Sequence, residues 1–269
     1  MLKTMTKMKV GVFTAIAVII VGALTTWFLK RSREEHVYVP PAPIEVTDEL
    51  VKKIIPGLIP AGHEKYKVKI LVEDLDGNGT KDIVLSSAVP PDPELGITEA
   101  KITIVEPTDT NGNYKLVAEY PFVERRDSMP YATNALDFDA DGRKELLVRT
   151  GFGGAYTNES ALFKINWDSK TLTWTKAGFP DGSKELLGLL QGASVKNYAD
   201  FALVDLDSDR TLEIVVKGAS LVDEAGNSLD PKNWEWNILI YKWNGEFFAY
   251  KPDLTKANVD KFKNFTPGE

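Results

Sequence analysis

The chain has 269 residues and a formal net charge of −7, with 43% hydrophobic and 26% charged residues. This length and composition suit one sizeable globular domain, and the acidic balance argues against nucleic acid as a partner. The chain contains no cysteine, which excludes both a disulfide framework and a lipoprotein linkage.

Residues 10–29 are apolar and contain no charged side chain. A segment of about 20 such residues spans the hydrocarbon core of a bilayer, so we predict a single transmembrane anchor that leaves residues 1–9 in the cytoplasm. A cleaved signal peptide is the alternative, with Val21 and Ala23 at the cleavage site and a secreted domain as the product. The apolar run continues through residues 27–29 and favours the anchor.

Residues 30–46 include Pro40, Pro41 and Pro43, a composition typical of a stiff, extended spacer. We expect the folded domain to occupy residues 47–269. A short helix is predicted over residues 47–55, with Thr47 as N-cap and Pro56 ending it, and a second over residues 253–265.

Between these two helices, one nine-residue pattern occurs three times, at 74–82, 137–145 and 205–213. The copies begin 63 and then 68 residues apart. A single copy could be an ordinary Asp-rich turn, but three copies at nearly fixed spacing indicate a structural repeat. In each copy, positions 1, 3, 5 and 9 carry a carboxylate or an amide, and an apolar triplet follows.

Carboxylates this close repel one another, so the pattern predicts a cation among them. Side chains at alternate positions of a tight loop can converge on one point, and oxygen donors in this number suit Ca²⁺. We expect up to three calcium ions, bound by the side chains at positions 1, 3, 5 and 9 and by the main-chain carbonyl at position 7. The predicted ligands are Asp74, Asp76, Asn78, Thr80 and Asp82; Asp137, Asp139, Asp141, Arg143 and Glu145; and Asp205, Asp207, Asp209, Thr211 and Glu213.

An EF-hand is excluded because its loop needs a Glu at position 12 and a helix on each side. Position 12 is Leu85, Val148 and Val216 here, and the flanking residues are short and β-branched, which predicts strands. A second hairpin is expected in each repeat, which makes four strands per unit. The predicted hairpins pair residues 101–105 with 114–120, 161–167 with 171–176, and 236–243 with 246–250.

With these three loops and their spacing, the chain resembles the FG-GAP and VCBS repeat family, whose calcium-loop repeats build integrin α-subunit propellers and occur in many bacterial surface proteins. The resemblance covers residues 62–250, and GFGGAY at 151–156 is loosely similar to the motif that names the family. It implies an all-β fold of three four-stranded, propeller-like repeats, with each loop joining two strands of a blade. It also implies a protein- or glycan-binding role.

The third copy departs from the pattern at position 6. Gly79 and Gly142 can adopt a positive φ there, whereas Arg210 would pay roughly 1 to 2 kcal/mol for it, so the third loop is predicted to be the weakest site. Three repeats are also too few for a standard ring, since closed propellers have about 4 to 8 blades. We therefore expect an incomplete or small propeller, and homo-oligomerisation would be one way to complete it.

Calcium is expected to stabilise the fold. At about 1 mM Ca²⁺ and a dissociation constant of about 0.1 mM, each site adds roughly 1.4 kcal/mol. Calcium modules of this weak kind fill outside the cell, and positive charges flank both ends of residues 10–29 without fixing an orientation. The loops therefore place the β domain outside the cytoplasmic membrane.

No catalytic motif is present: the sequence lacks a G-x-S-x-G elbow, a Walker loop and H-E-x-x-H. His36 and His63 belong to no acid–base cluster, and Trp167 and Trp243 are expected to pack between repeats rather than to stack on a ligand. We expect a non-enzymatic interaction or adhesion module of the cell surface. The alternatives are an extracellular carbohydrate-active enzyme, for which a cleft with two carboxylates outside the loops would argue, and a self-assembling surface component.

Overall fold

The computed structural model describes residues 44–61, 68–89, 98–124, 130–152, 158–179, 181–193 and 197–263. All of these residues lie in one compact unit, Pro43–Glu269. The predicted membrane segment at 10–29 lies outside the described residues, as do residues 1–9 and most of the spacer. Within the described ranges, no helix is both long enough and apolar enough to span a bilayer.

Helix α2, Asp48–Leu58, begins where the sequence predicts, because the Thr47 side chain accepts a hydrogen bond from the Leu50 backbone N–H at 3.3 Å and thereby caps the helix. The prediction that Pro56 ends the helix is wrong, since the helix continues through it. Pro56 lies in the last turn, where its missing N–H removes a single hydrogen bond, and the Ile59 N–H still bonds the Ile55 carbonyl at 3.2 Å.

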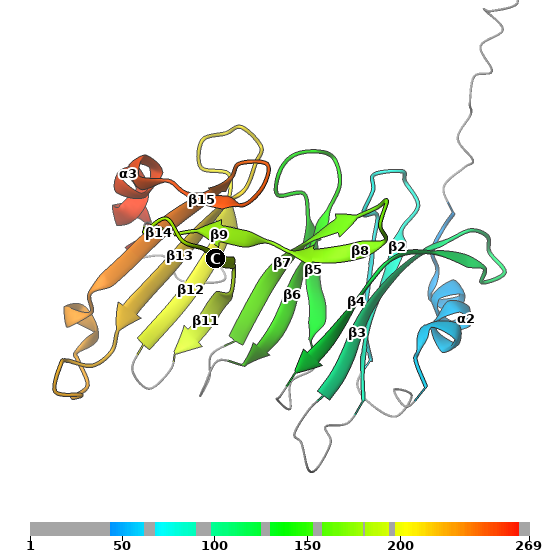
Figure 1. The fold of residues 1–269 in the computed structure, drawn as a ribbon, viewed down its shortest axis with the longest axis horizontal. Coiled ribbons are helices and arrows are strands. Elements are labelled where there is room, and N and C mark those ends of the chain that lie inside the picture. The colour runs from blue at the N-terminus through cyan, green and yellow to red at the C-terminus, as the bar shows by residue number, and fades with distance from the viewer. Residues whose placement is uncertain are drawn as a thin grey trace, which may run out of the picture. The chain divides into compact units, whose positions relative to one another are not determined.

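The rest of the described chain is mostly β-strand, as predicted, and forms three antiparallel four-stranded repeats (Figure 1). Each repeat contains one acidic loop between its first two strands and one further hairpin. Repeat 1 comprises β1 (Val68–Glu73), β2 (Asp82–Ala88), β3 (Thr98–Pro107) and β4 (Tyr114–Glu124); repeat 2 comprises β5 (Tyr131–Leu136), β6 (Glu145–Phe152), β7 (Asn158–Asn166) and β8 (Thr171–Trp174); repeat 3 comprises β12 (Asn197–Val204), β13 (Glu213–Ser220), β14 (Trp236–Trp243) and β15 (Phe248–Tyr250).

Three short strands between repeats 2 and 3 were not predicted: β9 (Lys176–Gly178), β10 (Lys184–Leu186) and β11 (Leu189–Ala193). Strand β11 pairs with both β7 and β12, and β9 pairs in parallel with β15. A parallel contact between β4 and β8 links repeats 1 and 2. These connections join all 15 strands into one mixed sheet, in which 13 strands form a continuous hydrogen-bonded path and β5 and β6 branch from it at β7.

The core lies between successive repeats, because side chains that alternate along each strand enter different apolar clusters. In β7, Ala161, Phe163 and Ile165 pack with side chains of repeat 1, whereas Leu162 packs with side chains of repeat 3. In β13, Ile214 contacts the cluster shared with repeat 2, and the next residue, Val215, faces the opposite way. A strand buried on both faces needs a continuous apolar run, which explains the triplet after each acidic loop.

A helix covers the outer face of each terminal repeat. Leu50 and Ile54 of α2 pack on Ile83 and Val105 of repeat 1, and helix α3, Pro252–Lys263, packs Phe262 on repeat 3. The strand path begins at β1 and ends at β10, and no pairing between described strands closes it into a ring. The helices on repeats 1 and 3 remove apolar surface from water, as capping elements do in a repeat protein.

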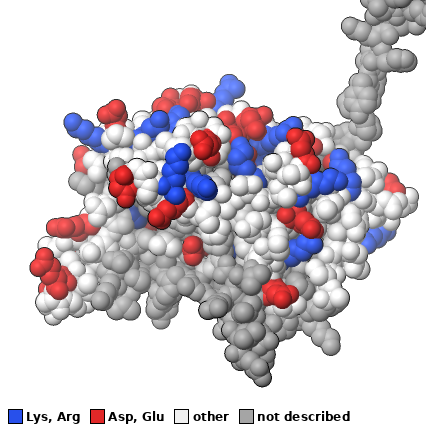
Figure 2. Space-filling view, in the orientation of Figure 1, with Lys and Arg blue, Asp and Glu red and all other residues white. Residues whose placement is uncertain are grey.

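Charges of both signs lie together on the surface of the described residues. On the face drawn in Figure 2, Lys and Arg side chains are interspersed among Asp and Glu side chains and do not gather into one basic area. The acidic loop between the first two strands, by contrast, occurs in every repeat.

Candidate metal centre

The fold brings together the carboxylates at positions 1, 3 and 9 of each acidic loop. In every loop, one oxygen from each of the three lies within 4.8 Å of the others, and the side chain at position 9 is buried. These groups are Asp74, Asp76 and Asp82 in repeat 1; Asp137, Asp139 and Glu145 in repeat 2; and Asp205, Asp207 and Glu213 in repeat 3. Three clusters that could hold a metal ion therefore occupy equivalent places in three repeats.

The first carboxylate folds each loop by accepting hydrogen bonds from later backbone N–H groups. Asp74 accepts from Gly77 and Gly79, both at 2.9 Å, and Asp205 accepts from Arg210 at 3.0 Å. Asp137 accepts hydrogen bonds in repeat 2 from the backbone N–H groups of loop positions 5 and 6, at 3.1 and 3.0 Å. These bonds run within nine residues, which is why a local pattern specifies the loop.

Each loop has positive φ at two positions, the fourth and the sixth. Both are glycine in repeat 1, where Gly77 and Gly79 have φ of 74° and 88°. Repeat 3 has a non-glycine residue at both, Ser208 with φ of 64° and Arg210 with φ of 75°. Arg210 thus has the positive φ on which the prediction of a weak third site depends, and the weakness of that site stays a prediction. Since the left-handed region costs a non-glycine residue roughly 1 to 2 kcal/mol, the first loop is the least strained of the three.

The side chain at position 5 does not belong to the carboxylate cluster of its loop. The oxygen at position 5 accepts the backbone N–H of position 7 in all three loops, at 2.7 Å for Asn78, 2.8 Å for Asp141 and 2.9 Å for Asp209. Metal ligation by position 5, and by the carbonyl groups of Thr80, Arg143 and Thr211, stays a prediction.

The carboxylate at position 9 is the most buried member of each cluster. Asp82 is 1% exposed, and its Oδ2 accepts the Leu75 N–H at 3.0 Å, whereas its Oδ1 has no hydrogen-bond partner among the described residues. Burial, reinforced by Asp76 and Glu106, raises the pKa of Asp82 to about 7. A buried oxygen that points into a carboxylate cluster without a donor fits a cation ligand.

The three repeats differ in the residue that faces position 9 from the third strand. Pairing of Ile83 with Val105, Leu146 with Phe163 and Ile214 with Tyr241 aligns the strands. In these antiparallel pairs, the residue before the second-strand partner lies opposite the residue after the third-strand partner. Position 9 therefore faces Glu106 in repeat 1, Lys164 in repeat 2 and Lys242 in repeat 3. Sequence reasoning missed all three residues, and only the strand register shows that they are equivalent.

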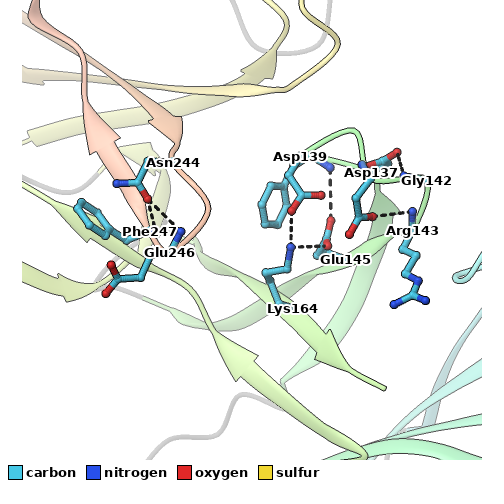
Figure 3. A network of polar contacts seen from close by, with 11 residues as sticks. Asp137, Asp139, Gly142, Arg143, Glu145, Lys164, Asn244, Glu246 and Phe247 are labelled. Carbon is cyan, nitrogen blue, oxygen red and sulfur yellow. Dashed lines mark hydrogen bonds and ion pairs between the residues drawn. The ribbon is translucent and has the colours of Figure 1, made fainter. Parts of the chain in front are cut away.

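The two lysines are ion-paired with the carboxylates of their loops. Lys164 pairs with Asp139 and lies 3.2 Å from Glu145, as Figure 3 shows. Lys242 lies 2.7 Å from both Asp207 and Asp209 and 2.9 Å from Glu213. Burial opposes the charge of both ammonium groups, but the carboxylates outweigh it and raise the pKa of both lysines.

A cavity of about 660 Å³ opens beside the second loop, between repeats 2 and 3. Three half-buried tryptophans, Trp167, Trp174 and Trp243, line it together with charged side chains that include Arg143. Trp243 also packs against Phe138, with ring centroids 5.3 Å apart. The predicted packing of Trp243 between repeats is thus present, and the same residue contributes to an aromatic cavity wall.

Comparisons of this chain with protein-family models, with curated proteins and with solved structures found no match. The likeness to FG-GAP and VCBS repeats therefore rests on the loop pattern alone, and the geometry of the loops and of the cavity is the basis for inferring a function.

Proposed function

We propose that this chain is a calcium-binding β-repeat protein of the FG-GAP and VCBS type, anchored in the membrane by residues 10–29, that presents an extracytoplasmic interaction domain. The main support for calcium binding is the carboxylate cluster of repeat 1, in which the buried Asp82 has an oxygen without a hydrogen-bond donor among the described residues. Calcium would stabilise the fold by neutralising this cluster.

Thermal unfolding of the full-length protein with 1 mM Ca²⁺ and with chelator tests the calcium proposal. One site with a dissociation constant of about 0.1 mM adds roughly 1.4 kcal/mol, and a domain of this size gains about 2 to 4 °C per kcal/mol. We expect a rise of about 3 to 6 °C that Asp74→Ala abolishes.

Asp109→Ala is the matched control for Asp74→Ala, because Asp109 also accepts backbone N–H groups in a tight turn but belongs to none of the carboxylate clusters among the described residues. This variant should lose some stability and keep the full calcium response. A melting temperature that does not respond to calcium in the native protein would refute the proposal.

We further propose that the tryptophan-lined cavity binds a glycan of the cell surface or its surroundings. The indole rings of Trp167, Trp174 and Trp243 line the cavity and would supply apolar contact to a sugar ring. Arg143 lies over the Trp167 ring and Lys164 over the Trp243 ring, where they would donate hydrogen bonds to sugar hydroxyl groups. The mixed charges seen in Figure 2 support a neutral or weakly charged ligand over nucleic acid.

Tryptophan fluorescence during titration with oligosaccharides tests the glycan proposal. Trp167→Ala should weaken binding at least tenfold. Trp234→Ala should not, because Trp234 stacks on Tyr198 and is not among the residues that line the cavity. Equal losses in both variants, or no binding by the native protein, would contradict this assignment.

A carbohydrate-active enzyme is the second candidate, since Asp168 and Glu246, two carboxylates outside the loops, also line the cavity. Both side chains are exposed, whereas a general acid needs an environment that keeps it protonated. Binding without hydrolysis is therefore the function that we favour, and release of reducing sugar that Glu246→Gln abolishes would reverse this preference.

A further inference from the structure

We propose that the ammonium groups of Lys164 and Lys242 take the place of the metal ion in repeats 2 and 3, so that the domain binds a single Ca²⁺, in repeat 1, with Glu106 as an additional ligand. This inference rests on the proposed calcium binding. It departs from the expectation of up to three ions that the loop pattern creates.

The three third-strand residues occupy equivalent positions in their repeats. The same register places Glu106, Lys164 and Lys242 opposite the buried carboxylate at position 9. In repeat 1 the third strand therefore adds a negative charge to the loop, and in the other two repeats it adds a positive one. A metal ion and an ammonium group satisfy the same carboxylates, so one excludes the other.

Lys164 and Lys242 already form ion pairs with the carboxylates of their clusters. Lys242 is hydrogen-bonded to both oxygens of Asp207, at 2.9 and 2.7 Å, and its side chain is 16% exposed. A calcium ion entering this loop would displace a largely buried ammonium group and leave it next to a dication. Because an unpaired buried charge is strongly unfavourable, the ion pair should persist.

The carboxylate cluster of repeat 1 differs from the other two in its charge balance. Within the described part of the chain, no Lys or Arg forms an ion pair with Asp74, Asp76 or Asp82. Lys115 pairs with Glu106 at 2.5 Å, and its side chain is 58% exposed, so it can turn into solvent when an ion binds.

Each loop retains at least one buried carboxylate oxygen without a hydrogen-bond partner among the described residues, on Asp82, on Asp139, and on Asp205 and Glu213. Of the three described clusters, only that of repeat 1 lacks an ion-paired ammonium group. Glu106 lies close to this cluster, since its Oε1 accepts a hydrogen bond at 3.3 Å from Asn78 at loop position 5. Four carboxylates and the loop carbonyl then form an oxygen-rich shell of the kind that Ca²⁺ prefers.

Isothermal titration calorimetry and equilibrium dialysis of the full-length protein with Ca²⁺ give the number of ions bound. We expect one ion per chain, lost in Asp82→Asn and retained in the double variant Asp139→Asn, Asp207→Asn. Glu106→Gln should weaken binding about tenfold or more, because charged ligands tune calcium affinity. Glu99→Gln, an exposed carboxylate on the same strand, should leave it unchanged.

Variants that remove the lysines should bind an additional calcium ion, which is the decisive test. Lys164→Gln should raise the stoichiometry from one to two by opening the cluster of repeat 2, and Lys242→Gln should do the same for repeat 3. Circular dichroism checks that each variant is folded, and if one lysine variant unfolds, the other carries the test. Three ions bound by the native protein would overturn this inference and leave the calcium proposal standing, whereas no bound ion would overturn both.

Discussion

Replacement of Asp82 by Asn should stabilise the metal-free fold. In that state, burial and then the nearby carboxylates raise the pKa of Asp82 from its ordinary value of 3.8 to about 7. A carboxyl group whose pKa is higher in the folded state than in the unfolded state disfavours folding once it ionises. Below a pH of about 4, Asp82 does not reduce the free energy of unfolding. As the pH rises through about 7, its ionisation lowers the free energy of unfolding.

The magnitude follows from the same values. One pKa unit corresponds to about 1.4 kcal/mol, so the ionised side chain of Asp82 costs the metal-free fold on the order of 4 kcal/mol above pH 7. Asn keeps the hydrogen bond that Asp82 accepts from the Leu75 N–H and carries no charge. We expect the Asp82→Asn variant to gain about 2 to 4 kcal/mol at pH 8 in chelator, and the gain to shrink towards zero near pH 4.

Urea denaturation followed by tryptophan fluorescence, at pH 8 and at pH 4.5 with chelator, measures this gain. Glu99→Gln removes an exposed charge from the same repeat and should change stability by less than about 0.5 kcal/mol. Calcium should stabilise the native protein at pH 8 and have no effect on the Asp82→Asn variant. If the variant is less stable than the native protein at pH 8 without metal, the electrostatic reasoning about this cluster is refuted.

Three further outcomes test the loops, the core and the terminal helix. Arg210→Gly should raise the unfolding free energy by about 1 kcal/mol in urea, because glycine adopts the positive φ at no steric cost, and no gain would argue against strain at that position. Phe248→Ala should cost about 3 to 5 kcal/mol in the same assay, because Phe248 is fully buried with its ring 5.1 Å from that of Phe138; a loss below about 1 kcal/mol would contradict the observed packing. Removal of residues 252–269 should expose Ile240 and its neighbours and cause self-association in size-exclusion chromatography, whereas a stable monomer would show that the outer face needs no cover.

The local geometry of the loops could be predicted from the sequence because their hydrogen bonds join residues only a few positions apart. Asp74 binds the backbone of Gly77 and Gly79 within one loop, so the nine-residue pattern contains all that the turn requires. The apolar triplets likewise predict strands, and the Asn244–Gly245 pair predicts a hairpin, from neighbouring residues alone. The all-β class and the four strands of each repeat follow from such local signals.

The residues that distinguish one loop from another could not be predicted from the sequence, because they reach the loops through contacts between segments far apart in the chain. Asn78 and Glu106 are 28 residues apart, and Lys242 is 35 residues from Asp207. The intervening loops differ in length between repeats, so no fixed spacing shows that Glu106, Lys164 and Lys242 are equivalent. The antiparallel register brings them to the same place.

The sequence by itself therefore determined three similar acidic loops and the strands around them, because turn formation and alternating burial are encoded within a few residues. Only the tertiary structure decided that two of the loops contain an internal cation, that three tryptophans surround one cavity, and that a helix covers each outer repeat. These features arise where strands and repeats pack side by side, and the free energy of such packing depends on partners that a local pattern does not contain.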